Sequence, residues 1–330
     1  MRKILFLTFL ACISVVPSFV GAQINVNIPY ALSNELGIEI IPNYPRPNER
    51  VWVNLSLYTD DLNSADIAWY RGGKVELQGK GKVSYSFVMG KVGQESKIEI
   101  RIKLLSGVSF SKSFTLNPAS VDMAWESNSY VPPFYKGKAL HPKQGSLKIV
   151  AMPEFVKNGK RIPAENLVYE WSNDSEVFQS QSGYGKNVLN VSGSILGSTD
   201  EFEVLVTDPV NNIVAEDFIT INPVDPKISF YENNPYYGYI FDTAISPILD
   251  FNSEELYLTA SPYYMSREAN LRLKYHWRLN SQSLPELEDS RTAIFRRPEE
   301  AGSSIISLRL ENTNRILQEA EKRINIRFDD

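Results

Sequence analysis

The sequence predicts an all-β protein made of three tandem antiparallel β-sandwiches that follow a signal peptide. Short segments along the chain alternate apolar and polar residues, which is the period of a strand with one buried face. Closing segments recur at a fixed spacing of 105 residues and end at Pro118, Pro223 and Phe328. Tyrosine (17 residues) and phenylalanine (16) dominate an aromatic content of 12%. Because these side chains favour strands over helices, the composition agrees with the periodicity.

The first element is a predicted secretory signal peptide, residues 1–22. The basic pair Arg2-Lys3 precedes an apolar run over residues 4–16, which is short for a membrane span. Small residues at 20–22 suit cleavage before Gln23. An uncleaved membrane anchor is the alternative. We therefore expect an exported protein that is periplasmic, on the cell surface or extracellular.

The single cysteine, Cys12, lies within this predicted signal peptide. Its context loosely resembles a lipidation signal, which is a further alternative. After cleavage the chain would have no cysteine, which excludes disulfides, cysteine-ligated zinc and thiol nucleophiles. Each module must then rely on its hydrophobic core, which requires about 70 residues or more. No later segment has the roughly 18 apolar residues of a membrane helix, so none is expected after signal removal.

The charge pattern argues against nucleic acid as a partner. The chain carries 34 Lys+Arg and 39 Asp+Glu, a net charge of −5. Both signs are interspersed, without the basic stripe that follows a phosphate backbone.

Three modules are expected, at residues 23–118, 119–224 and 225–330. Each closes with a predicted hairpin, and the strand pairs are 97–104 with 109–116, 201–208 with 215–222, and 304–312 with 322–328. Turn signals every ten or so residues within units of about 100 residues are typical of a sandwich. Between the last two strands, the segment from Asn314 is expected to form a short helical turn, with a hairpin loop as the alternative.

An aromatic strand precedes each hairpin. The three are ADIAWYRG (65–72), LVYEWSND (167–174) and LKYHWRLN (273–280), and each follows a further strand, at 51–58, 146–155 and 255–264. Alternation places Trp69, Trp171 and Trp277 on the core face, joined by Tyr169 and Tyr275. We expect these five side chains to fill the space between two sheets rather than to bind a cofactor.

The second module resembles the PKD-like and immunoglobulin-like modules of bacterial exported surface proteins. Tyr169-Glu170-Trp171 is similar to the Tyr-x-Trp strand of PKD domains, and residues 201–221 resemble their closing hairpin, with Phe202 where tyrosine is usual. The Gly-Asp-Gly turn after the tryptophan is replaced by Ser172-Asn173-Asp174, and the other two modules keep only the tryptophan strand and the hairpin. The resemblance implies immunoglobulin-like sandwiches with spacing, adhesion or scaffold roles, and it implies no catalysis.

The two histidines give no catalytic signature. His276 lies between Tyr275 and Trp277 and should face solvent, and His141 lies in a polar turn, so both are expected on the surface. Neither belongs to an HExxH spacing, and no GxSxG nucleophile motif is present. We expect no enzymatic activity.

One acidic loop, YTDDLNSAD, is a weak calcium candidate through Asp60, Asp61 and Asp66. Oxygen-rich loops can hold Ca²⁺, but the spacing does not fit an EF-hand. A polar turn between two strands is favoured, so no cofactor is expected.

Tyrosine and phenylalanine beside proline are candidate contact residues. They lie in segments that we interpret as edge strands broken by proline, from Ala124 and from Ser229, and in SPYY. The residues are Tyr130, Phe134, Tyr135, Tyr236, Tyr237, Tyr263 and Tyr264. We expect them to line joints between adjacent modules, with stacking on a sugar or on a protein partner as the alternative.

The leading hypothesis is a non-enzymatic, exported structural or protein-interaction subunit of a bacterial cell-envelope or surface assembly, such as a pilus or secretion apparatus. Envelope or surface proteins are the expected partners. The alternative is a carbohydrate-binding surface protein that uses exposed Tyr and Phe next to Pro. A hydrolase accessory module ranks third.

Overall fold

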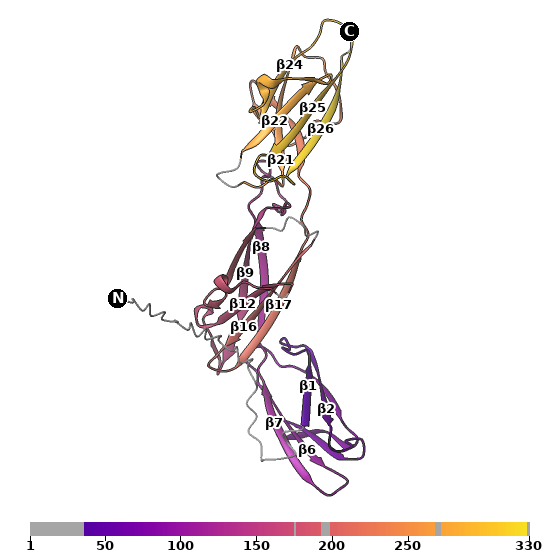
Figure 1. Cartoon of the computed structure of the whole chain (residues 1–330), viewed down its shortest axis with the longest axis vertical. Helices are drawn as coiled ribbons and strands as arrows, with labels where there is room; N and C mark the ends of the chain where they lie inside the picture. The colour runs from indigo at the N-terminus through magenta and orange to yellow at the C-terminus, as the bar shows by residue number, and fades with distance from the viewer. Residues whose placement is uncertain (1–35, 175, 193–198, 268–271, 329–330) are drawn as a thin grey trace, which may run out of the picture. The chain divides into compact units, whose positions relative to one another are not determined.

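The computed structural model describes residues 36–174, 176–192, 199–267 and 272–328, and strands dominate these ranges (Figure 1). The helices within them are single 3-10 turns, at Ala164–Asn166, Gln179–Gln181 and Pro285–Leu287. The chain is an all-β protein of tandem immunoglobulin-like β-sandwiches, which confirms the predicted fold class. The predicted signal peptide, residues 1–22, lies outside the described residues. No helix in the described ranges is long and apolar enough to cross a membrane.

Two compact units can be distinguished in the chain. Of the described residues, the first comprises 36–38, Leu55–Tyr85 and Lys97–Thr115. The second comprises Glu39–Asn54, Ser86–Ser96 and Leu116–Asp330, and so contains the second and third sandwiches together.

The first sandwich has two sheets, in the orders β1-β2-β5 and β4-β3-β6-β7. Its strands are β1 (Leu36–Ile41), β2 (Arg50–Leu57), β3 (Asp66–Arg71), β4 (Lys74–Lys80), β5 (Ser84–Val88), β6 (Ser96–Lys103) and β7 (Ser109–Leu116). In the first unit, the buried ring of Trp69 on β3 lies 5.4 Å from that of Tyr85 on β5. This contact joins the two sheets.

The second sandwich has the sheets β15-β9-β8 and β13-β12-β16-β17, with β14 also paired to β12 and a short β10-β11 hairpin. Its strands are β8 (Ser120–Ser127), β9 (Ser146–Glu154), β10 (Val156–Lys157), β11 (Lys160–Arg161), β12 (Val168–Asn173), β13 (Glu176–Val177), β14 (Gly183–Tyr184), β15 (Val188–Ser192), β16 (Asp200–Asp208) and β17 (Ile213–Ile221). Tyr169 and Trp171 on β12 share one buried cluster with Ile149 and Leu189 of the other sheet. The aromatic strand therefore lies between the two layers.

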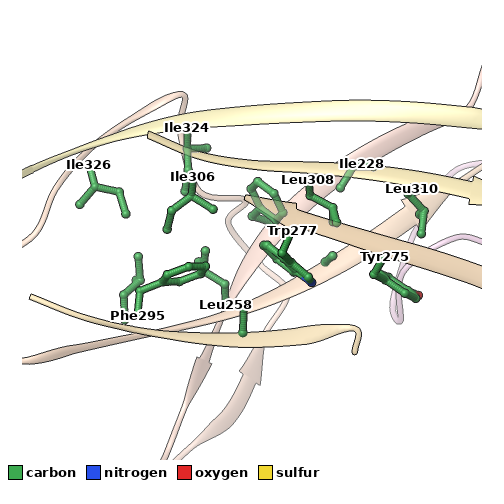
Figure 2. Packing of buried hydrophobic residues seen from close by; sticks show 14 of the residues in the cluster. Ile228, Leu258, Tyr275, Trp277, Phe295, Ile306, Leu308, Leu310, Ile324 and Ile326 are labelled. Atoms are coloured by element: carbon green, nitrogen blue, oxygen red, sulfur yellow. The ribbon is translucent and has the colours of Figure 1, made fainter. Parts of the chain in front are cut away.

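The third sandwich has the sheets β19-β18-β21-β24 and β20-β26-β25-β22-β23. Its strands are β18 (Lys227–Asn234), β19 (Gly238–Ile240), β20 (Ile248–Asp250), β21 (Glu255–Tyr263), β22 (Leu273–Leu279), β23 (Gln282–Ser283), β24 (Thr292–Arg296), β25 (Gly302–Asn312) and β26 (Glu319–Phe328). Figure 2 shows Trp277 among Leu258, Phe295 and Leu308, side chains that come from both sheets. Its ring also stacks on Phe230, at 5.5 Å between centroids.

The tryptophan strands pair with the first strand of each closing hairpin in an equivalent register. The tryptophan in each case faces an aliphatic residue, and the pairs are Trp69 with Ile100, Trp171 with Val204, and Trp277 with Leu308. The three sandwiches thus repeat one packing scheme.

The prediction of a short helical turn from Asn314 is wrong. The segment forms turns between β25 and β26, in which the N–H of Gln318 donates to the Arg315 carbonyl and the N–H of Asn312 donates to the Gln318 carbonyl. Strand β26 begins at Glu319, opposite Glu311 on β25. Extending this long antiparallel ladder overrides the local helix propensity of the segment.

The expectation of two edge strands holds for only one of the two segments. Strand β8 lies at the edge of its sheet, whereas β18 pairs with β19 on one side and with β21 on the other. The error arose because Pro235 lies in the turn between β18 and β19, where a missing N–H donor disturbs no ladder.

Candidate functional site

The three core tryptophans fill the core as predicted, and they also make hydrogen bonds that the sequence pattern did not indicate. All three are fully buried, and each indole N–H donates to a backbone carbonyl. The acceptors are Lys82 for Trp69 (2.7 Å), Lys186 for Trp171 (2.8 Å) and Ser290 for Trp277 (2.9 Å). Each acceptor lies two residues before a strand of the opposite sheet, at the start of β5, β15 or β24. The indole of one sheet is therefore hydrogen-bonded to the segment in which the chain passes to the other sheet. We call this arrangement the indole clamp.

The two core tyrosines remain neutral phenols. Tyr169 is buried, and its hydroxyl donates to the Ala164 carbonyl at 3.1 Å. Burial, with a smaller effect of Glu165, raises the pKa of Tyr169 to about 12. Burial likewise raises the pKa of Tyr275. These side chains pack in the core and do not line a ligand site.

A long loop of the second sandwich contacts the third sandwich through backbone groups. This loop, residues 128–145 between β8 and β9, is called the docking loop below. The Tyr130 N–H donates to the Met265 carbonyl at 2.7 Å, and the Tyr264 N–H donates to the Tyr130 carbonyl at 2.8 Å. Ser129 forms an antiparallel bridge with Ser266. The loop thus continues the backbone pairing of the third sandwich beyond the end of β21.

Four of the candidate aromatics meet where the docking loop reaches β21. The hydroxyls of Tyr135 and Tyr264 are 2.8 Å apart, and the ring of Tyr135 packs edge-on against Tyr263 at 5.6 Å. Burial, followed by the hydrogen bond with Tyr135, raises the pKa of Tyr264 to about 12. Tyr130 also packs against the core of the third sandwich. Phe134 stays 91% exposed beside them.

A buried glutamine forms the polar centre of the same contact. Gln318 is 0% exposed, and its Nε2 donates to the carbonyl of Lys143 in the docking loop (2.7 Å) and to Oγ of Ser266 (2.8 Å). Its Oε1 accepts from the N–H of Ser266 (2.9 Å) and from Nδ2 of Asn312 (3.0 Å). All four hydrogen-bonding positions are satisfied, as a buried amide requires. The sequence analysis did not predict a role for Gln318, because none of its neighbours in the chain indicates that this side chain is buried.

His141, expected on the surface, is fully buried in the docking loop. Its backbone carbonyl accepts from the N–H of Val224 at 2.8 Å, whereas neither ring nitrogen has a hydrogen-bond partner among the described residues. Burial lowers the pKa of His141 to about 4, so the ring is neutral near pH 7. The local sequence is polar, so the neighbouring residues in the chain gave no sign that this side chain is buried. His276 is partly exposed, with Nε2 at 3.2 Å from Oε1 of Glu311.

The carboxylates of Asp60 and Asp61, in the acidic loop before β3, accept hydrogen bonds from other residues of the same loop. One carboxylate oxygen of Asp61 accepts from the backbone N–H and from the side-chain amide of Asn63, both at 2.9 Å, and these bonds hold the pKa of Asp61 below its ordinary value. Asp60 accepts from the N–H of Asp61. In the described part of the chain, no group of three or more His, Cys, Asp or Glu side chains is placed to hold a metal ion, and this includes Asp60, Asp61 and Asp66.

The outer surface of the third sandwich carries a further group of aromatic side chains. On β18 and β21 the residues that alternate with the core point away from it, and they include Tyr231, Tyr257 and Tyr263. The hydroxyls of Tyr231 and Tyr263 are 2.7 Å apart. Rings continue outward from Tyr231 to Phe241 (5.2 Å) and from Phe241 to Tyr239 (5.7 Å). These five residues are called the tyrosine face. Sequence alternation could have identified Tyr257, which lies between the core residues Leu256 and Leu258.

Two more candidate tyrosines form the tip of the hairpin between β18 and β19. Oδ1 of Asn234 accepts from the N–H groups of Tyr236 (2.9 Å) and Tyr237 (3.2 Å). Gly238 closes the turn at φ 75°, a conformation that favours glycine. The backbone of the tip is therefore fixed, while the two side chains are 90% and 85% exposed. This position differs from the expected one in a joint between modules.

No protein-family model matches this chain, and no curated protein sequence matches it. Solved structures of similar fold include the three N-terminal domains of the Highly Immunogenic Outer Capsid protein of bacteriophage RB49, at 10% identity and TM-score 0.28, covering 89% of this chain and 98% of that chain. The central fibronectin-III array of RIM-binding protein matches at 10% identity and TM-score 0.29, covering 92% and 99%. Bacteroides ovatus SGBP-B in complex with a mixed-linkage heptasaccharide matches at 10% identity and TM-score 0.21, covering 89% and 70%. This likeness concerns the tandem β-sandwich fold alone.

Proposed function

We propose that this chain is a non-enzymatic, exported structural or protein-interaction subunit of a bacterial cell-envelope or surface assembly. It would lose residues 1–22 on export and act in the periplasm, on the cell surface or outside the cell. Its modules would be the three tandem sandwiches, with limits near 23–118, 119–224 and 225–330.

The docking loop carries this proposal. Neighbouring domains in one chain move relative to each other by default, unless a substantial interface restrains them. Here backbone hydrogen bonds at Tyr130, the buried amide of Gln318 and the tyrosine contacts join the second and third sandwiches. Such a contact suits a subunit whose task is to hold binding surfaces at a set spacing.

Location and processing test the proposal first. An epitope-tagged chain should appear in the envelope or extracellular fraction, and mass spectrometry of its N-terminus should find Gln23. Cytoplasmic protein that retains Met1 would contradict the proposal. A partner captured by cross-linking in intact cells should also retrieve this chain in the reciprocal experiment.

A second candidate function is binding of carbohydrate at the surface. The tyrosine face and the exposed tips of Tyr236 and Tyr237 favour it, because exposed tyrosine rings present an apolar surface together with a polar hydroxyl.

A further inference from the structure

We infer that the tyrosine face and the β18–β19 hairpin tip together bind a neutral polysaccharide. The inference deepens the second candidate function and rests on it. The stacking rings would be those of Tyr236, Tyr237 and Tyr239, which are exposed, and that of Tyr257, which is half-buried, with nearby polar groups for hydrogen bonds to sugar hydroxyls. Tyr231 is buried and Tyr263 packs against the docking loop, so these two rings support the face from behind or beside it.

The rings of Tyr257 and Tyr239, and the backbone of the hairpin tip, are held in place before any ligand arrives. The hydroxyl of Tyr257 donates to Oε2 of Glu255 at 2.5 Å, and Nε of Arg296 donates to Oε1 of the same carboxylate at 2.9 Å. Tyr239 is packed on Phe241, and the backbone of Tyr236 is fixed by Asn234. A preorganised site loses less side-chain freedom on binding, which favours affinity.

The hairpin tip and the sheet surface form one continuous area. In the sheet, β18 pairs with β19 on one side and with β21 on the other. The pairs Asn233–Tyr239 and Glu232–Leu258 put Tyr239 and Tyr257 on the same face of the sheet, with β18 between them. Tyr236 lies in the turn that leads into β19. Ile294, opposite Tyr257 on β24, extends the exposed apolar surface. A row of rings on a sheet suits an extended chain of flat sugar units.

The charges around the rings decide which class of polymer fits. Glu255 lies beside Tyr257 and pairs with Arg296, so these two charges neutralise each other. Glu232 pairs with the core residue Leu258 and therefore lies on the other face of the sheet. A row of rings whose flanking charges are paired gives no electrostatic gain to an anionic glycan, whereas its polar groups can bond the hydroxyls of a neutral one.

Affinity electrophoresis and calorimetry on the chain from Gln23 test the inference. The probes are hydroxyethylcellulose and soluble starch as neutral polymers, and polygalacturonate as an anionic one. We expect binding to at least one neutral polymer and none to polygalacturonate. Tyr236→Ala and Tyr239→Ala should each weaken binding by about tenfold, by analogy with the loss of one aromatic ring that stacks on a nucleic-acid base.

A matched control is Tyr58→Ala, which removes a tyrosine that is 95% exposed elsewhere in the chain. It should bind like the parent protein. Absence of binding to both neutral probes, equal binding by all variants, or preference for polygalacturonate would overturn the inference. If neither neutral glycan binds, and a protein partner binds the parent chain but not Tyr236→Ala, the surface is a contact site for protein. In that case the envelope-subunit proposal would stand, because fractionation and N-terminal processing test it separately.

Discussion

Replacing Gln318 by leucine tests the contact between the second and third sandwiches. Leucine has a similar size but cannot form any of the four side-chain hydrogen bonds of Gln318. The substitution leaves the N–H of Ser266 and Nδ2 of Asn312 without this acceptor in buried surroundings, and it removes a donor from the Lys143 carbonyl.

The magnitude follows from these lost partners. A buried polar group without its partner costs about 1–3 kcal/mol, so the two buried donors of Ser266 and Asn312 together should cost about 2–6 kcal/mol. For a module of about 100 residues, the midpoint of thermal unfolding should then fall by roughly 10 °C or more. A typical domain has only about 5–15 kcal/mol of stability, so the effect is large.

Hydrogen exchange followed by mass spectrometry is the appropriate assay for Gln318→Leu. Peptides from the docking loop and from the turn before β26 should exchange faster, whereas peptides from β12 and β16 should not change. The matched control is Gln282→Leu, at an exposed glutamine on β23 of the same sandwich. If Gln318→Leu and Gln282→Leu exchange alike at the docking loop, the proposed contact does not hold the two sandwiches together.

Three further predictions concern the second sandwich, the docking loop and the acidic loop. Trp171→Phe removes the indole donor to the Lys186 carbonyl and should destabilise the second sandwich by about 1–3 kcal/mol. Trp52→Phe, at an exposed strand position, should change stability little. Equal midpoints of urea unfolding for these two variants would contradict this prediction. The folded-state pKa of His141, about 4, lies below its ordinary value of 6.5, so the unfolded chain binds the extra proton between these values. Stability should therefore decline as pH falls from 6.5 towards 4, by at most about 1.4 kcal/mol per pH unit, and His141→Leu should remove this component from the difference between pH 7 and pH 5 midpoints. A chelator should leave the melting midpoint unchanged because Asp61 is already hydrogen-bonded within its loop, and a lower midpoint would indicate a bound cation.

Strand positions and the role of the core tryptophans followed from local periodicity. Alternation in LVYEWSND identifies the face that carries Trp171, and the structure fully buries Leu167, Tyr169 and Trp171 on that face. Alternation is a property of a few adjacent residues, so it can be read without knowing the partner strands. The same pattern could not show that the indole N–H binds Lys186, because any backbone carbonyl can serve as acceptor.

The contacts between sandwiches could not be predicted in this way. His141 and Gln318 both lie in polar segments, and both are nevertheless buried. The side chain of Gln318 bonds to Lys143 and Ser266, and the carbonyl of His141 accepts from Val224, and these partners are all distant in sequence. For the aromatic residues beside proline, the sequence indicated contact residues but not their location. Tyr135 and Tyr264 meet at the docking loop, whereas Tyr236 lies at a hairpin tip.

Exchange of the indole N–H protons in the chain from Gln23, followed by NMR on protein labelled at its five tryptophans, tests the indole clamp most directly. Trp69, Trp171 and Trp277 should show three strongly protected signals, because each N–H is buried and bonded to a carbonyl. Trp52 and Trp125, which are less buried, should exchange rapidly. If any of the three clamp signals exchanged as fast as that of Trp52, that sandwich would not be closed over its own tryptophan.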